Sequence, residues 1–526
     1  MQTYGVCLQS GSNNTLSGNT ISNNSVGLKT ISSPGNSIHY NDIFANTANG
    51  LESNVNLDAT NNYWGSKHGP KPYGSGNGYL GPVTVRPWSK VPFTQAGAAY
   101  QATLGMDDYC GFCGDPVNMS TGAFVYAHTD IQVPAKGIPL DFVRTYNSND
   151  EGDGALGYGW SQNWQLSPNP QANGDVVILH GDGRQDRFTK NPDNSFSAPT
   201  GRHDLLLKNQ DGTYAMQSQD KKTYAFDASN SLSSVVSENG QTTAFTYDAN
   251  KRLTTVTDPA GRTLTIVYNQ DNRIDHVSDP QGNTVNFGYS STGDLTTVTD
   301  QNGGVTSYAY DGNHRITGIT DPNGHTSANN TYDAQGRVVN QTDAENNLIS
   351  LSYDSASKKT TLTRQMDPGN PSQDQVITFY RDDNYRLIRQ EDALGKETVY
   401  TYDTAGNQDS ATDRRGTVNR KIFDSSGNVT DEYKANGSSE QEHTGYTYNA
   451  KNRPLTKTDA RGHTTGYAYD SNGTNVMQVS YPAVTNYAGA VSNYSESFSY
   501  NPDGTVATKT DKNGNVTSYT YNSYGS

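Results

Sequence analysis

The sequence is 526 residues long, carries a formal net charge of −15 and contains only 17% charged residues. Its 52 glycines and 35 tyrosines are typical of β-strands joined by tight turns, whereas a disordered chain would have few aromatic residues and high charge. Lysine and arginine form no cluster, which argues against a nucleic-acid partner. No apolar stretch reaches the roughly 18 residues of a membrane span, so we expect no membrane span in this segment.

Residues 1–90 carry a period of 22 or 23 residues. Apolar positions recur in three pairs, Leu16 with Ile38, Ile21 with Ile43, and Leu28 with Leu51. Asparagine-rich corners separate them, at Asn13, Asn14, Asn23, Asn24, Asn36 and Asn46. Because asparagine tolerates left-handed bends and forms side-chain ladders, this pattern predicts two or three coils of a parallel β-helix. Residues 61–65 and 81–88 resemble the closing coil of right-handed parallel β-helix domains of secreted bacterial proteins.

Some parallel β-helices are carbohydrate-active enzymes, whose sites need carboxylates clustered on one face of consecutive coils. The acids in this segment are Asp42, Glu52 and Asp58, which do not share a register at the 22-residue period. The pattern favours a stalk or adhesive coil over an enzyme. Since the start lacks the basic and apolar regions of a signal peptide and so few coils are present, we expect the natural protein to begin further upstream.

Residues 91–113 are predicted to be a linker that carries the Cys110-x-x-Cys113 motif. A redox dithiol would need a strand before the motif and a helix after it, and a zinc site would need two more ligands at similar spacing. The motif therefore favours a local disulfide between Cys110 and Cys113 in an oxidising compartment. A free pair, and metal or redox chemistry, stay open as alternatives.

Residues 114–222 are predicted to form a β-rich module and the first irregular strands. Phe124 and Tyr126 alternate with small or polar residues, and so do Leu140, Phe142 and Arg144. The phrases at residues 117–124, 139–148 and 157–161 closely resemble the N-terminal module that precedes the repeats of bacterial RHS, or YD-repeat, proteins.

Residues 223–526 repeat an aromatic-x-aromatic-Asp phrase, usually every 21 residues, in about 14 units of which the last is incomplete. A period of this size predicts a stack of supersecondary units that bury one another's faces. The aromatic before the acid or its substitute is found at Phe226, Tyr247, Tyr268, Tyr289, Tyr310, Tyr332, Tyr353, Tyr380, Tyr402, Phe423, Tyr448, Tyr469, Tyr500 and Tyr521.

Each unit is predicted to be a β-hairpin. Phe245 and Tyr247 share one strand face, and the Asp-x-x-Gly-Arg phrase at residues 333–337 supplies a turn with glycine at a positive φ. The second strand of each unit ends at another turn, which begins at Asp258, Asp279, Asp300 and Asp321. We expect stacking to align the aromatic pairs into ladders, in a sheet of about 28 strands that must curl because strands twist.

These turn and strand phrases also resemble RHS/YD-repeat proteins, which include bacterial polymorphic toxins, insecticidal toxin shells and the animal teneurins. The resemblance covers roughly residues 114–526 and implies a spiralling sheet that winds into a hollow shell. In the toxins that shell encloses a C-terminal effector, which is released by self-cleavage through aspartates. This sequence has no Asp-Pro-x-Gly-Leu core phrase and no unrelated effector segment, so we expect both to belong to sequence beyond Ser526.

The predicted fold is therefore all-β, with the C-terminal end of a parallel β-helix, the RHS module and part of an RHS shell. Because the aspartates recur in nearly every unit, they are interpreted as structural, and no catalytic, cofactor-binding or metal-binding residue is predicted. The predicted function is a non-catalytic scaffold of a secreted or cell-surface bacterial protein, for toxin encapsulation, delivery or intercellular competition. Its partner would be an effector encoded downstream. The alternatives are an adhesin that binds cell-surface glycans and a β-helix carbohydrate-active enzyme.

Overall fold

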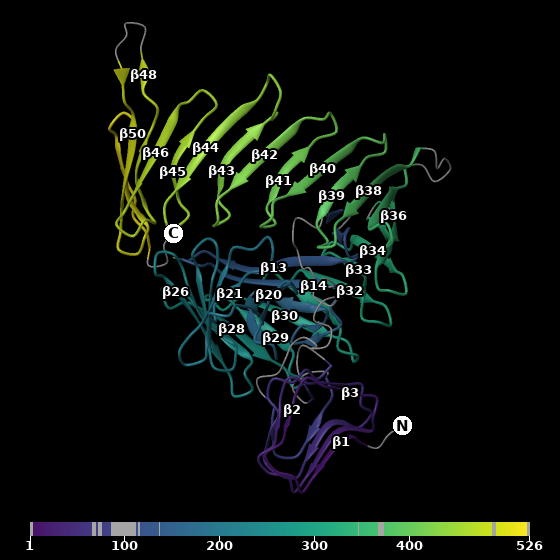
Figure 1. The fold of residues 1–526 in the computed structure, drawn as a ribbon. Coiled ribbons are helices and arrows are strands. Elements are labelled where there is room, and N and C mark those ends of the chain that lie inside the picture. Colours follow the sequence, from purple (N-terminus) through teal and green to yellow (C-terminus); the bar gives the residue numbers. More distant parts are fainter. Residues whose placement is uncertain are drawn as a thin grey trace.

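The structure is a computed structural model that describes residues 4–65, 70–71, 76–85, 112–113, 116–135, 137–343, 345, 347–366, 373–485 and 491–522. The described elements are all strands, as expected for an all-β chain. Figure 1 shows a small parallel β-helix at the N-terminal end, a central β-module and one long sheet that curls around the module. The part of the chain that is described holds no helix able to cross a membrane.

The N-terminal body is a parallel β-helix, as the 22-residue period predicts. Its strands stack in parallel from coil to coil, in the orders β1-β4-β7-β9, β2-β5-β8-β10 and β3-β6. They are β1 (Tyr4–Gln9), β2 (Thr15–Leu16), β3 (Thr20–Ser22), β4 (Val26–Ile31), β5 (Ser37–Ile38), β6 (Asp42–Phe44), β7 (Asn49–Ser53), β8 (Leu57–Asp58), β9 (Tyr79–Leu80) and β10 (Val83–Thr84). The three predicted pairs are all in register: Leu16 with Ile38, Ile21 with Ile43 and Leu28 with Leu51.

Asparagine ladders hold the corners of this helix. The Nδ2 atom of Asn19 donates to Oδ1 of Asn41, and Nδ2 of Asn41 donates to Oδ1 of Asn62, each at 3.0 Å. A second ladder joins Asn24 to Asn46 at 3.3 Å. Buried amides need partners, and an identical amide one coil away supplies one at every step.

The central module consists of short antiparallel sheets. Its strands are β11 (Phe112–Cys113), β12 (Val117–Asn118), β13 (Val125–Val133), β14 (Leu140–Asn147), β15 (Asp153–Gly154), β16 (Gly157–Tyr158), β17 (Trp160–Gln162), β18 (Ser167–Pro170), β19 (Val176–Leu179), β20 (Gln185–Lys190) and β21 (Phe196–Ser197). Phe124, Phe142 and Trp160 are fully buried and join the same apolar core as the long sheet.

The long sheet has 29 antiparallel strands, nearly all paired with their neighbours in sequence. Its first part, here named the covered part, comprises β22 (Leu205–Lys208), β23 (Tyr214–Gln217), β24 (Thr223–Phe226), β25 (Leu232–Val236), β26 (Thr242–Tyr247), β27 (Leu253–Thr257), β28 (Thr263–Tyr268), β29 (Ile274–Ser278), β30 (Thr284–Tyr289), β31 (Leu295–Thr299), β32 (Val305–Tyr310), β33 (Ile316–Thr320), β34 (Thr326–Tyr332), β35 (Val338–Thr342), β36 (Leu348–Asp354), β37 (Lys359–Arg364) and β38 (Gln375–Arg381).

The remaining strands are named the open part. They are β39 (Leu387–Glu391), β40 (Glu397–Tyr402), β41 (Gln408–Thr412), β42 (Val418–Phe423), β43 (Val429–Lys434), β44 (Glu442–Tyr448), β45 (Pro454–Thr458), β46 (Thr464–Tyr469), β47 (Val476–Ser480), β50 (Ser495–Tyr500), β51 (Val506–Thr510) and β52 (Val516–Ser518), with the small hairpin β48 (Val484–Thr485) and β49 (Val491–Ser492) inserted before β50. In Figure 1 the sheet passes the module, turns at β32–β36 and returns above it through β38–β46. The predicted spiral is therefore present.

Turns of the open part meet the loops that precede or begin the covered part, along a line of contact named the seam. The seam joins Gly201 N to Ala405 O at 2.7 Å, His203 Nε2 to Asn407 Oδ1 at 2.7 Å, Gln219 Nε2 to Ser426 O at 3.0 Å, and Glu238 to Arg453 in an ion pair. One pass of the sheet is thus fastened directly onto the next.

The strand register corrects one predicted repeat position. In regular units a β-bulge precedes the repeat tyrosine, as between Thr246 and Tyr247. In β38 the bulge falls between Tyr380 and Arg381, while Phe379 is the buried aromatic. Arg381 therefore occupies the repeat position, and the prediction of Tyr380 there was wrong by one residue. The acid of this unit is Asp382, which directly follows Arg381.

Candidate functional site

The repeat tyrosine fastens each hairpin to the previous one. Its hydroxyl donates to the backbone carbonyl of the first residue of the preceding unit's second strand, as Tyr268 does to Leu253 at 2.9 Å. The same bond joins Tyr247, Tyr289, Tyr310, Tyr332, Tyr353, Tyr402, Tyr448, Tyr469 and Tyr500 to Leu232, Ile274, Leu295, Ile316, Val338, Leu387, Val429, Pro454 and Val476, in that order. Burial raises the pKa of Tyr268 above its usual value, so the hydroxyl stays a donor.

Three repeat positions depart from this arrangement. Phe226 and Phe423 end their strands but have no hydroxyl to donate. Tyr521 is half-buried and lies beyond β52.

The acid after the tyrosine organises the hairpin turn. Asp248 Oδ1 accepts the backbone N–H groups of Asn250 and Arg252, each at 2.9 Å, and its Oδ2 accepts Nε of Arg252 at 2.7 Å. Burial would raise the pKa of Asp248, but these hydrogen bonds outweigh it and hold the pKa below its usual range. The residue before the arginine is left-handed. In the corresponding turn of Asp333 this residue is Gly336, whose φ is 82°.

The arginine of the turn lies over the ring of the next unit's tyrosine. The Arg252 guanidinium is 4.5 Å from the Tyr268 ring centroid, and Arg337 is 4.5 Å from that of Tyr353. Among the described residues no ring contact joins the repeat aromatics of consecutive units, so the predicted aromatic ladders were wrong. The reason is distance: units repeat every two strands, about 10 Å apart, and the arginine fills that gap.

The second set of aspartates organises the opposite turns. In Asp258, Asp279, Asp300 and Asp321, Oδ1 accepts the backbone N–H groups two and four residues later. The backbone N–H of His325 is the main cause that lowers the pKa of Asp321. The structure therefore does not bring these four aspartates together. Each aspartate organises its own turn.

The module packs on the inward face of the covered part. Arg144 is 1% exposed; its Nε donates to Asp130 Oδ2 at 2.7 Å and its Nη1 to the Tyr308 hydroxyl at 2.7 Å. Trp160 Nε1 donates to the Tyr310 hydroxyl at 2.9 Å. Tyr308 is 164 residues from Arg144 and Tyr310 is 150 residues from Trp160 in sequence, which is why sequence periodicity could not reveal these two contacts. The module thus forms a plug bonded to the sheet.

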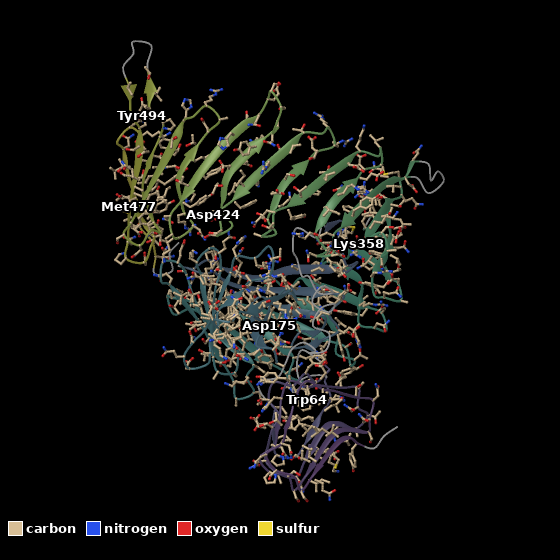
Figure 2. The ribbon with its side chains drawn as sticks, in the orientation of Figure 1. Trp64, Asp175, Lys358, Asp424, Met477 and Tyr494 are labelled. Atoms are coloured by element: carbon tan, nitrogen blue, oxygen red, sulfur yellow. The ribbon has the colours of Figure 1, made fainter. Side chains whose placement is uncertain are left out.

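Cross-strand pairs on the inward face change character along the sheet. In the covered part they are buried, and all but one are apolar: Phe245 with Val256, Ile266 with Val277, Phe287 with Val298, Tyr308 with Ile319, and Leu351 with Leu362. The exception is Asn330 with Gln341, which are joined by a buried side-chain hydrogen bond. In the open part they become Tyr400 with Ala411, Lys421 with Glu432, Tyr446 with Lys457, Tyr467 with Val479, and Phe498 with Lys509, none of them buried. Figure 2 shows side chains crowded around Asp175 and a single layer of strands near Asp424. The open inward face is the candidate functional surface.

The remaining predicted residues are the cysteines. Cys110 lies outside the described residues, and of Cys113 only the backbone in β11 is described. The described Cys7 is free and exposed. Across the described ranges, no group of three or more His, Cys, Asp or Glu side chains is placed to hold a metal ion.

Comparison with protein families identifies the repeats. Residues 226–263 and 289–326 match the model of the RHS repeat, within the hairpin array described above. The hairpin array of this chain therefore contains RHS repeats. Residues 114–188 of the chain match a domain of unknown function, DUF6531, which falls on the plug module. Residues 1–82 match the model described as periplasmic copper-binding protein (NosD). The described coils do not fit a copper centre, because they hold no such ligand group.

Curated relatives of the RHS chain carry the name WapA. It is 27% identical over 196 residues to the tRNA3(Ser)-specific nuclease WapA of Bacillus spizizenii, and 27% identical over 145 residues to the tRNA nuclease WapA of Bacillus subtilis strain 168. These matches span 37% and 27% of the chain but only 8% and 6% of the relatives. The chain therefore corresponds to less than a tenth of each relative's length.

Solved structures similar to the RHS chain include toxin complexes. A TcdB2–TccC3 complex without its hypervariable C-terminal region aligns with a TM-score of 0.41 and 10% identity, over 77% of this chain and 27% of that one. A Photorhabdus luminescens Tc holotoxin pore aligns with a TM-score of 0.38 and 11% identity, over 76% of this chain and 25% of that one. Both scores are below 0.5.

Proposed function

We propose that this RHS chain is a non-catalytic wall segment of a secreted or cell-surface container that holds a toxic effector for delivery or intercellular competition. The observation that carries the proposal is one continuous sheet whose first pass is filled by the plug while its second pass keeps an open inward face. A sheet fastened to itself along the seam has the form of a wall. Its open face is where a second polypeptide would lie.

The chemistry of the open face supports a polar occupant. Lysine, glutamate and tyrosine stand where the covered part has valine, isoleucine and phenylalanine, so a dry apolar core would be costly there. The recurring aspartates are engaged in turns, which supports a structural role for them. The names of the WapA relatives describe nucleases, and we assign that activity to the parts of those proteins that this chain does not match.

Lysine reactivity tests the proposal. The chain would be produced with and without the polypeptide encoded in frame directly downstream, and acetylation rates of Lys421, Lys457 and Lys509 would be followed by mass spectrometry. We expect all three to react about tenfold more slowly in the longer protein, while Lys396, in an exposed turn, reacts equally in both. Equal rates at the inward lysines, or a gene that ends at Ser526, would contradict the proposal.

A further inference from the structure

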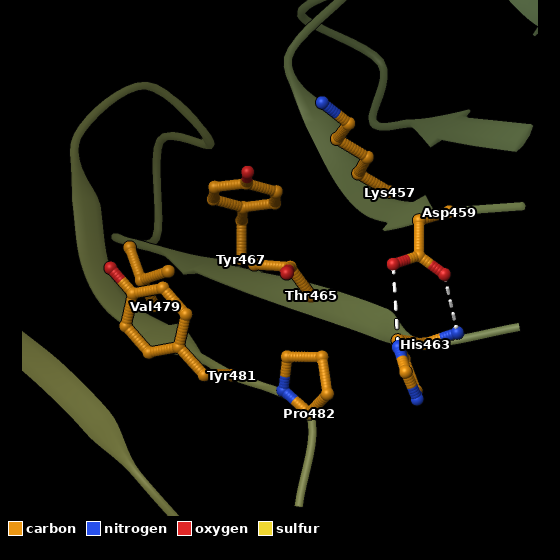
Figure 3. A pocket seen from close by; sticks show the side chains of 8 residues that line it. All are labelled: Lys457, Asp459, His463, Thr465, Tyr467, Val479, Tyr481 and Pro482. Carbon is orange, nitrogen blue, oxygen red and sulfur yellow. Dashed lines mark hydrogen bonds and ion pairs between the residues drawn. The ribbon is translucent and has the colours of Figure 1, made fainter. Parts of the chain in front are cut away.

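A hollow of about 430 Å³ opens on the inward face of the open part, at β45, β46 and β47. It is lined by Lys457, Asp459, His463, Thr465, Tyr467, Val479, Tyr481 and Pro482. Figure 3 shows the Tyr467 ring standing up from β46, with Lys457 on the neighbouring strand and Tyr481 and Pro482 on the other side. A hollow of this size accommodates one or two sugar rings rather than a folded partner.

Tyr467 offers an unoccupied aromatic face at this hollow. In the covered part its counterpart Tyr308 is 5% exposed, binds Arg144 through its hydroxyl, and is contacted by the Trp160 ring at 5.3 Å. Tyr467 holds the same strand position but is only half-buried, and its hydroxyl makes no hydrogen bond to the described chain. The surface that the plug occupies in one unit is therefore available to a ligand in the other.

The opposite wall of the hollow is fixed. The Tyr481 hydroxyl donates to Glu496 Oε2 at 3.0 Å, and Lys512 Nζ lies 3.4 Å from the Tyr481 ring centroid. Glu496 is also paired with Lys509 at 3.3 Å. Because these contacts hold the ring in place, ligand binding would cost little side-chain ordering on this side.

Lys457 supplies a cation at the hollow. It stands opposite Thr465 in the strand register, so it is the diagonal neighbour of Tyr467 on the same face, about 7–8 Å away. Its Nζ lies 5.9 Å from the Tyr446 ring centroid and has no carboxylate partner among the described residues. A charge-assisted bond to a ligand carboxylate is therefore open to it.

The acid that lines the hollow is already engaged. Asp459 Oδ1 accepts the backbone N–H groups of Arg461 and His463, each at 2.9 Å, and its Oδ2 lies 3.4 Å from His463 Nδ1. Nearby, Glu496 is paired with Lys509, and Lys512 lies over the Tyr481 ring. Lys457 is therefore the charge at the hollow that a ligand can meet, and it favours an acidic ligand over a neutral one.

We propose that this hollow binds a uronic-acid saccharide, whose C–H face stacks on the Tyr467 ring while its carboxylate pairs with Lys457. Sugar C–H groups carry partial positive charge and meet the negative face of an aromatic ring favourably. Tyr467 and Lys457 lie on one face of adjacent strands as diagonal neighbours, so a single ligand can meet both. The site uses side chains of this chain alone and is tested without the downstream polypeptide, which under the proposed function would also cover Lys457.

Titration calorimetry of the full chain with three probes tests the site: trigalacturonate, hyaluronan hexasaccharide and neutral cellohexaose. We expect saturable binding of an acidic probe, weakened by salt, and no comparable binding of cellohexaose. Preference between the two acidic probes distinguishes a pectin-like source from an animal glycosaminoglycan. Absence of binding by either acidic probe at about 10 mM, or equal binding of cellohexaose, would overturn the proposal.

Matched variants separate the site from the general surface. Tyr467→Ala and Lys457→Gln should each weaken binding about tenfold or more, and Tyr467→Phe should retain most of it because the ring remains. Tyr400→Ala, at the position of Tyr467 in another open unit, and Lys421→Gln, at an inward lysine of β42, should leave the affinity unchanged. Circular dichroism of each variant checks the fold. Equal losses in both sets of variants would refute a discrete site.

Discussion

The covered and open parts of the sheet are built from the same hairpin but meet different surroundings. Both use the tyrosine-to-carbonyl bond and the aspartate turn, as Tyr268 and Tyr469 illustrate. They differ at the inward cross-strand pairs, where Ile266 and Val277 give way to Tyr446 and Lys457. The unit's fold therefore depends on the repeated phrase, while the residues between the phrases decide what the wall will contact.

Exchanging the inward residue between the two parts gives the largest expected effect. Val277→Lys places an unpaired charge at a position with 0% exposure and should lower the free energy of unfolding by about 3–5 kcal/mol. Lys457→Val, at the same position of an open unit, should change it by less than about 0.5 kcal/mol. Hydrogen exchange in urea, read for each hairpin, measures both. Similar losses would mean that the open face is covered too.

Truncating an inward aromatic should give a smaller but still unequal pair of losses. Phe287 is 6% exposed and its ring centroid lies 6.0 Å from that of Phe142 in the plug, so Phe287→Ala should cost about 3–5 kcal/mol. Phe498→Ala, in the open part, should cost about 1 kcal/mol. The same hairpin-resolved exchange applies, and a large loss at Phe498 would contradict the comparison.

Removing one tyrosine hydroxyl should have a modest effect. Tyr268→Phe leaves the Leu253 carbonyl without its donor in a buried setting and should cost about 1–1.5 kcal/mol. Tyr469→Phe removes the equivalent bond to Pro454, where water can replace the donor, and should cost less than about 0.5 kcal/mol. Urea midpoints of the two variants provide the measurement, and a reversed order would break the comparison.

Acidification should have the smallest effect on stability, and the effect should be the same in the covered and open parts. The pKa of Asp333 and that of Asp403 lie below the usual range, because turn hydrogen bonds outweigh the opposing effect of burial. A lowered folded-state pKa means that the contribution is present above the unfolded value of about 3.9 and is lost as pH falls through the folded value. Urea midpoints should stay constant from neutral pH to about pH 5 and fall below pH 4. Asp333→Asn should reduce that fall slightly, and a midpoint that rises in acid would contradict the assignment.

Sequence patterns predicted the local structure well. The coil period identified the pairs Leu16 with Ile38 and Leu28 with Leu51, because each coil repeats the same apolar contacts. The hairpin array and its spiral were also predicted from strand alternation and turn residues. The prediction of Tyr380 failed because β38 carries an arginine, Arg381, where the other units carry an aromatic residue before the acid.

The division into covered and open parts was not predicted. It depends on contacts such as Arg144 with Tyr308, 164 residues apart, which no repeat period encodes. One signal was present all the same. The inward residue of the second strand changes from valine or isoleucine, as at Val256 and Val298, to Glu432, Lys457 and Lys509. This position therefore indicates the open face, although Val479 in the open part and Gln341 in the covered part depart from the trend.

The seam sets the circumference of the array. Every tyrosine bond joins neighbours, so deleting or duplicating one 21-residue unit would leave all other such bonds intact. Seam contacts instead join residues that are far apart in sequence. Gln219 contacts Ser426 across 207 residues, and Arg453 contacts Glu238 across 215. One unit more or fewer between them would present each loop with the wrong partner. Duplication of a hairpin is compatible with the bonds between neighbouring units, but the seam contacts fix the number of hairpins in one turn of the spiral.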